Sequence, residues 1–188
     1  MLYTLSGKLK SKSEDFAVIE NGGFGFKVFM NQRTMRSLPT DNVELFVHLH
    51  VRENALDLYG FQDEKSRKLF EMLNSVSGIG PKTALGVLDT DTTEKIMAAI
   101  IEKKIDFLTK TSGIGRKTAE RVILELRNKL SLPRAEALTK TMDVDADVED
   151  ALVNLGYPRR EVKNALSRLG EKPEKWEERL KETLKLLS

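Results

Sequence analysis

A repeated octapeptide constrains this chain more than any other feature of its sequence. Residues 77–84 have the sequence SGIGPKTA and residues 112–119 have SGIGRKTA, so seven of eight positions are identical at an offset of 35 residues. The two glycines permit a tight turn whose backbone can approach a partner closely, because no Cβ stands in the way. The isoleucine between them is expected to anchor the turn in a core. Each copy is therefore predicted to form a hairpin between two helices.

The helix that follows each hairpin is predicted to bind phosphate at its start. A helix N-terminus presents unpaired N–H groups and carries partial positive charge. Lys82 and Lys117 add a full charge beside those amides, and the neighbouring threonines add hydroxyl donors. A single Gly-Ile-Gly could be only a compact turn, but two copies with Lys-Thr at the same offset favour binding. The candidate phosphate-binding residues are Gly78, Gly80, Lys82, Thr83, Gly113, Gly115, Arg116, Lys117, Thr118 and Arg121.

Composition excludes several classes of function. The chain has no cysteine and two histidines, which rules out disulfides, thiolate zinc sites and His-rich metal centres. It has no phosphate loop for ATP hydrolysis, no apolar run long enough to span a bilayer, and no signal peptide at its start. A cytoplasmic, nucleoid-associated protein is expected. The net charge is only +2, so the case for nucleic acid depends on local geometry.

Residues 1–62 are predicted to form a small β-barrel. Alternating apolar residues indicate strands over residues 3–12, 15–20, 24–30, 43–52 and 56–61, with a short helix over residues 31–38. In the third strand, Phe24, Phe26, Val28 and Met30 are expected to face the core. Five strands with a helix between the third and fourth favour a closed barrel of the OB type.

The rest of the chain is predicted to be helical, which gives an α+β multidomain protein. Residues 63–130, with their two hairpins, resemble the helix-hairpin-helix family, which implies a domain that grips the DNA backbone without reading bases. One of its helices carries an apolar stripe of Ala119, Val122, Ile123, Leu126 and Leu130. Residues 131–144 lack a consistent apolar period and are predicted to be a linker. Residues 145–188 are predicted to form a three-helix, UBA-like module. Such a small tethered module is expected to be a docking unit.

An acidic tip is predicted between the last two strands of the barrel. Glu53 and Asn54 lie at this turn, where acids and asparagine are common. Beside a DNA-binding domain, however, an anion would repel phosphates and could separate strands. His48 and His50 share one face of the preceding strand, but a third metal ligand is missing. A two-carboxylate hydrolase built on Glu53 and Asp57 is disfavoured, because nothing places them in a pocket.

Four motifs carry a resemblance to the RuvA family, which recognises Holliday junctions in bacteria. They are VRE at residues 51–53, LYGF at residues 58–61, GIGRKTAER at residues 113–121 and LGY at residues 155–157. The order of barrel, duplicated hairpin, linker and three-helix tail also matches, so the resemblance covers essentially the whole chain. One departure is that the family often has two adjacent acids at the pin, whereas this chain has Glu53 followed by Asn54.

The resemblance implies a non-catalytic DNA-binding subunit of a helicase complex, acting in recombination, DNA repair and the SOS response. Four subunits would hold a four-way junction open and square-planar, and in some members two tetramers pair into an octamer. The hairpins would grip the arms and Glu53 would lie at the crossover. The tail would dock the hexameric ATPase RuvB through Leu152, Leu155 and Tyr157. The chain itself would bind no cofactor, since ATP and Mg²⁺ belong to the motor, and the RuvC resolvase is a further candidate partner.

Two other classes of function remain as alternatives. A helix-hairpin-helix DNA glycosylase would need a catalytic Asp after the second hairpin, but only Glu120 and Glu125 follow on the helix. A base-flipping pocket is also disfavoured at 6% aromatic residues. A generic OB-fold binder of single strands would need aromatic platforms. Phe24, Phe26 and Phe29 are available, although two of them are expected to face the core.

Overall fold

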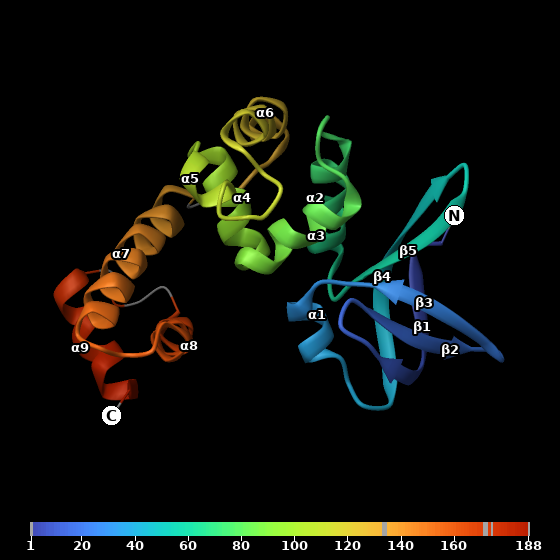
Figure 1. Cartoon of the computed structure of the whole chain (residues 1–188), viewed down its shortest axis with the longest axis horizontal. Helices are drawn as coiled ribbons and strands as arrows, with labels where there is room; N and C mark the ends of the chain where they lie inside the picture. Colours follow the sequence, from blue (N-terminus) through green and yellow to red (C-terminus); the bar gives the residue numbers. More distant parts are fainter. Residues whose placement is uncertain (1, 133–134, 171–172, 174, 188) are drawn as a thin grey trace. The chain divides into compact units, whose positions relative to one another are not determined.

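The computed structural model describes residues 2–132, 135–170, 173 and 175–187. The chain divides into two compact units, residues 1–131 and residues 132–188. The first unit contains a β-barrel followed by a set of helices, and the second contains helices alone (Figure 1).

The barrel has the predicted OB-type arrangement of five strands and one short helix. Its elements are β1 (Thr4–Lys12), β2 (Phe16–Asn21), β3 (Phe24–Phe29), α1 (Gln32–Ser37), β4 (Asn42–Arg52) and β5 (Ala55–Phe61). The strands close in the order β1-β2-β3-β5-β4, and only the β3–β5 pair is parallel. The helix between the third and fourth strands begins at the Asn31 cap, whose side chain accepts a hydrogen bond from the Thr34 amide at 2.9 Å.

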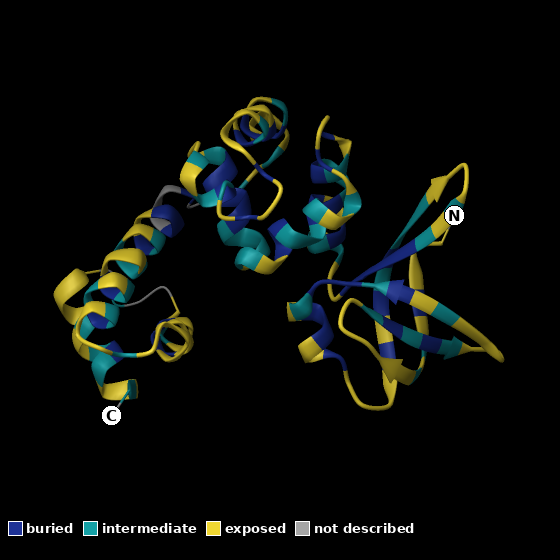
Figure 2. Cartoon of the chain, viewed as in Figure 1, coloured by how far each residue is buried: buried dark blue, intermediate teal, exposed yellow. Residues whose placement is uncertain are grey.

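Buried and more exposed residues alternate along the strands (Figure 2), and the buried ones fill the barrel core. Val43, Leu45 and Val47 of β4 are buried, and Val28 of β3 has no exposed surface. Phe24 is an exception to the predicted core face, because its side chain is 73% exposed. It follows the Gly22-Gly23 turn, where both glycines have positive φ, and so lies at the end of the hairpin beyond the core.

Helix α2 (Glu64–Ser75) joins the barrel to the helical part of the first unit. It begins at Asp63, whose carboxylate accepts a hydrogen bond from the Ser66 amide at 2.7 Å. Phe70 of α2 is fully buried, with its ring centroid 4.9 Å from that of Phe61 and 5.1 Å from that of Tyr59. These aromatic contacts attach the helix to β5.

Among its described residues, the first unit has four further helices and a 3₁₀ turn. They are α3 (Pro81–Thr90), α4 (Thr93–Ile101), α5 (Ile105–Leu108), α6 (Arg116–Leu126) and the 3₁₀ turn Arg127–Lys129. Helix α6, which carries the predicted apolar stripe, packs on α2, α4 and α5. Ala119, Val122, Ile123 and Leu126 of α6 are buried, as their spacing predicts. Both copies of the repeated octapeptide lie between helices, the first between α2 and α3 and the second between α5 and α6.

The second unit contains α7 (Ala135–Asn154), α8 (Arg159–Leu169) and α9 (Trp176–Leu187). Its core is formed by Val148, Leu152, Val162 and Leu166. A buried arginine supports this small core. The Arg179 side chain, which has no exposed surface, forms an ion pair with Asp145 and donates to the Pro173 and Gly170 carbonyl oxygens at 3.0 and 2.7 Å. The ion pair and the hydrogen bonds offset the cost of removing the Arg179 charge from water.

The predicted irregular linker over residues 131–144 is helical from Ala135 onward, where it forms the first half of α7. That part of the linker prediction is wrong. The segment from Ala135 to Asn154 contains no Gly or Pro, and four of its residues are Ala, the residue with the highest helix propensity. The weak apolar periodicity of residues 135–144 therefore does not mean that this segment is non-helical. Residues 133–134 lie outside the described residues.

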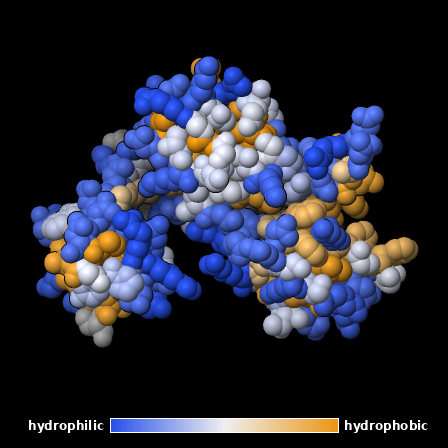
Figure 3. Space-filling model, viewed as in Figure 1, coloured by the Kyte–Doolittle hydropathy of each residue, from blue (hydrophilic) through white to orange (hydrophobic). Residues whose placement is uncertain are grey.

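The surfaces of both units are largely polar. Figure 3 shows hydrophilic residues over much of the visible face, with apolar residues gathered on parts of the barrel and of the second unit. Within the described residues, none of the helices combines the length and the apolar character that crossing a membrane requires.

Gly7 of β1 is predicted to be indispensable for closing the barrel. A Cβ at this position would lie 2.2 Å from the Glu20 carbonyl oxygen, which is backbone and cannot swing away. Gly7→Ala should therefore lower the free energy of unfolding by about 3 kcal/mol. The matched control is Gly25→Ala, whose Cβ would meet only Val18 Cγ1 at 3.4 Å. Urea unfolding of the full chain compares the two, and equal stability of both variants would contradict this account.

Candidate nucleic-acid interface

The two hairpins have nearly the same backbone conformation. Gly78 and Gly113 have φ values of +93° and +87°, a region that favours glycine. Ile79 and Ile114 are each 4% exposed, so both plug the turn into the core as predicted. Their amides donate to the carbonyl oxygens of Val76 and Thr111 at 3.0 and 3.1 Å. The sequence repeat is therefore also a structural repeat.

Each hairpin leads into a helix whose first turn lacks a side-chain cap. Gly80 is the N-cap of α3 and Gly115 is the N-cap of α6, and neither can supply a side-chain hydrogen bond. A Cβ on either glycine would meet nothing within 4 Å, so a partner can approach the backbone there. The first-turn N–H groups of both helices are consequently available to an anion. Pro81 contributes no N–H, so α3 offers one donor fewer than α6.

The two hairpins lie side by side and contact each other reciprocally. A Cβ on Gly78 would lie 4.0 Å from the Thr118 hydroxyl, and a Cβ on Gly113 would lie 3.5 Å from the Thr83 hydroxyl. Each threonine thus packs against the glycine of the other motif. The sequence assigns the threonines to phosphate binding, and the structure shows that they also border the contact between the motifs.

The four predicted cations at the hairpins differ in what they contact. Lys82 and Lys117 are exposed, and neither forms an ion pair with any residue that the structure describes. Arg116 Nε pairs with Glu120 at 3.2 Å, and its side chain is 77% exposed. Arg121 Nη1 donates to the Ser77 carbonyl oxygen of the first hairpin at 3.0 Å. The lysines are therefore the cations most readily available to phosphate.

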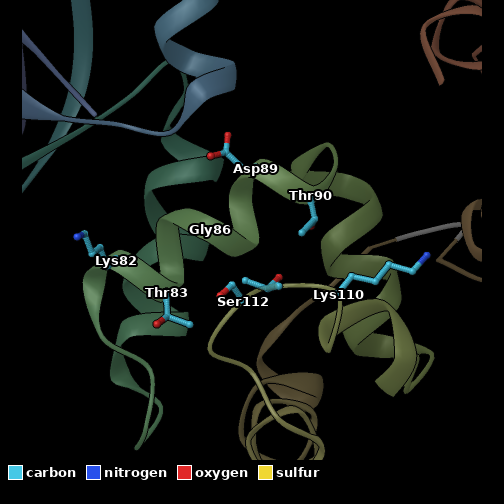
Figure 4. Close-up of a pocket in the computed structure, with 8 residues that line it drawn as sticks. Lys82, Thr83, Gly86, Asp89, Thr90, Lys110 and Ser112 are labelled. Carbon is cyan, nitrogen blue, oxygen red and sulfur yellow. The ribbon is translucent and has the colours of Figure 1, made fainter. Parts of the chain in front are cut away.

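A groove of about 440 Å³ lies beside the second hairpin (Figure 4). Gly86 of α3 lies on one side, and Thr111 and Ser112 lie on the other. The Lys82 and Lys110 side chains extend to opposite sides of the view. Sequence reasoning did not identify this groove, because its walls come from segments about 25 residues apart that only the fold brings together.

The acidic tip is present as predicted. Glu53 and Asn54 form the turn between β4 and β5, and both are exposed (Figure 2). Asp57 does not add a second free charge to the tip, because it forms an ion pair with Arg52. Glu53 is therefore the acid that the tip itself presents.

An apolar pair at the base of the tip was not predicted. Val51 and Leu56 lie directly opposite each other in the β4–β5 ladder, and they are 64% and 73% exposed. The sequence pattern could have indicated this pair. Val51 continues the alternating series of Val43, Leu45 and Val47 along β4, but it lies beyond the end of the barrel core. Two exposed apolar side chains flanking one acid make the tip partly apolar as well as anionic.

The histidines contact α2 and the barrel and do not form part of a metal centre. His48 Nδ1 lies 2.9 Å from a carboxylate oxygen of Glu71, and its ring packs against Phe70. His50 lies edge-on to the Tyr59 ring. Burial raises the pKa of the Tyr59 hydroxyl, and the nearby Asp57 charge adds to the shift. Among the described residues, no group of three His, Asp or Glu side chains is arranged to hold a metal ion.

The predicted docking residues of the second unit separate into exposed and buried members. Leu155 is 70% exposed and Tyr157 is half-buried beside the core. Leu152 has no exposed surface, so its prediction as a contact residue is corrected to a core position. The end of the helix explains the difference, because Leu152 lies within α7 and faces the core, whereas Leu155 follows the last residue of that helix.

Comparison with known families matches three parts of the chain. The RuvA N-terminal domain model matches residues 1–60, a SAM-like helix-hairpin-helix tandem model matches residues 70–128, and the RuvA C-terminal domain model matches residues 143–188. These ranges cover the barrel, the paired hairpins and most of the second unit.

Curated relatives match the chain along nearly its full length. A protein of Chloroflexus aggregans is 37% identical over 98% of this chain and 97% of its own, and one of Geobacter sulfurreducens is 36% identical over 100% and 99%. A protein of Prosthecochloris aestuarii is 39% identical over 86% of this chain and 85% of its own. All three are named Holliday junction branch migration complex subunit RuvA. On its motifs, its fold and these similarities, the chain belongs to the RuvA family.

Proposed function

We propose that this protein binds four-way junction DNA through the sugar-phosphate backbone and takes part in branch migration with a RuvB-type ATPase. The observation that carries the proposal is the pair of side-by-side hairpins, each opening onto an uncapped helix N-terminus beside an exposed lysine. Such contacts hold DNA without reading its bases. The names of the curated relatives support the same function.

The tip between β4 and β5 gives the proposal its preference for a junction. A carboxylate near a phosphate is repelled by about 1 kcal/mol at 4 Å in water, and by several-fold more where water is excluded. Glu53 would act this way at a crossover, and Val51 and Leu56 beside it would exclude water. Four copies would bring four such tips together, which is why the proposal includes a homotetramer.

We further propose that the chain performs no chemistry of its own and binds no cofactor, with ATP and Mg²⁺ used by the motor. A helix-hairpin-helix glycosylase would need a catalytic Asp after the second hairpin, whereas the acids that follow it here are glutamates on α6. Glu120 pairs with Arg116 on the surface of α6, and Glu125 lies on the same helix. A single-strand binder is also disfavoured, because it would need exposed aromatic side chains for base stacking. Of the three candidates, Phe26 and Phe29 are half-buried and Phe24 is exposed.

Lys117→Ala should weaken binding to junctions and duplexes alike, because the contact is to phosphate. The slope of log K against log salt should fall by about 0.9, the value for one phosphate contact. Lys68→Ala on α2 is the matched control, since it removes the same charge outside both hairpins and should leave the slope unchanged. Fluorescence anisotropy across a salt series measures both. A loss confined to one DNA sequence would argue against backbone binding.

Glu53→Gln should preserve or strengthen junction binding, because it removes a repulsive charge while keeping the shape of the turn. Branch migration with the motor should change in rate. Gel-shift affinity and a strand-exchange assay separate the two effects. If the variant lost junction binding, the tip would be an attractive contact and the repulsion account would be wrong.

Leu155→Ser should weaken binding to the motor by about tenfold or more, as expected for an apolar anchor. Junction binding should remain intact, because this residue belongs to the second unit. Leu186→Ser on α9 is the matched control, at 42% exposure. Calorimetric titration with the purified RuvB partner provides the measurement. Equal losses for the two variants would remove Leu155 from the docking surface.

A further inference from the structure

The two hairpins are alike in backbone and differ in how they are held. In the first, Arg121 of α6 donates from Nη1 to the Ser77 carbonyl oxygen at 3.0 Å, across 44 residues of sequence. Ser77 and Ser112 are equivalent positions of the repeat. No group in the described part of the chain donates to the Ser112 carbonyl oxygen. The first hairpin therefore has a support that the second lacks.

The sequence repeat shows why the second hairpin lacks a contact equivalent to the bond from Arg121 to Ser77. Subtracting the 35-residue offset from Arg121 gives Gly86 of α3, which has no side chain to reach across. The groove in Figure 4 lies over Gly86 and is lined on its other side by Thr111 and Ser112. Thr111 is 6% exposed, and its hydroxyl has no hydrogen-bond partner in the described structure. The groove thus occupies the place that corresponds to the Arg121 side chain in the other motif.

From this asymmetry we infer that Arg121 is a positioning residue, which fixes the first hairpin against α6 so that the two hairpins present their helix N-termini together. This inference rests on the proposed function and changes the role predicted for Arg121 from the sequence, where it was a phosphate ligand. A guanidinium is a strong hydrogen-bond donor to a carbonyl oxygen. The second hairpin, over the open groove, is the more adjustable of the two.

Two amides report on the hairpins separately. The Ile79 amide is bonded to the Val76 carbonyl oxygen within the first, and the Ile114 amide to the Thr111 carbonyl oxygen within the second. The Ala119 amide, bonded to the Gly115 carbonyl oxygen at 3.0 Å, reports on opening of α6 itself. Hydrogen exchange of these three amides in the DNA-free protein, read by NMR, therefore separates local release of a hairpin from general unfolding.

Arg121→Gln should speed exchange at Ile79 by about tenfold, the effect of losing one hydrogen bond, and leave Ile114 and Ala119 unchanged. Arg116→Gln is the matched control, because it removes the same charge from α6 without a bond to a hairpin. Faster exchange at all three amides in Arg121→Gln would show a general loss of stability and overturn the inference.

Salt dependence of junction binding gives a second, independent readout. A positioning role predicts weaker binding by Arg121→Gln with the salt slope retained, because the phosphate contacts still form once the hairpin is ordered. A slope lower by about 0.9 with unchanged Ile79 exchange would identify Arg121 as a phosphate ligand and overturn the inference. The exchange readout is made without DNA, so it stands or fails separately from the proposed junction binding.

Discussion

The reciprocal contact between the two hairpins is the constraint on which the rest of the interface depends. Gly78 and Gly113 have positive φ, and each faces the threonine of the other motif. A side chain at either glycine would be strained by the backbone and would also meet that threonine. The two hairpins therefore lie next to each other, and each leads directly into the N-terminus of a helix, α3 or α6. The proposed phosphate binding would use the backbone amides at these two N-termini.

The barrel serves this interface by carrying the acidic tip. Its closed sheet fixes the β4–β5 ladder, and the Arg52–Asp57 ion pair neutralises the acid nearest the tip. What remains is one carboxylate, Glu53, above an apolar pair. Helix α2 packs on β5 through Phe70 and leads directly into the first hairpin. The same short segment thus links the barrel that carries the acidic tip to the paired hairpins.

Much of this architecture could be predicted from the sequence, because its signals are local. The period of the strands, the α6 stripe and the doubled octapeptide each specify a nearby structure, and the structure confirms the barrel and both hairpins. Three features could not be predicted, because they depend on distant partners or on packing. The bond from Arg121 to Ser77 spans 44 residues, Leu152 is buried within α7 whereas Leu155 follows the end of that helix and is exposed, and the chain is already helical from Ala135.

The central claim is that backbone gripping by the paired hairpins becomes selective for junctions through the tip. The most direct test measures the affinity of the full chain for a four-way junction and for linear duplexes with the same arm sequences, over a range of salt concentrations. The account predicts a large preference for the junction, with a steep salt dependence on both substrates. Equal affinity for the two substrates would contradict it and would leave a general duplex clamp.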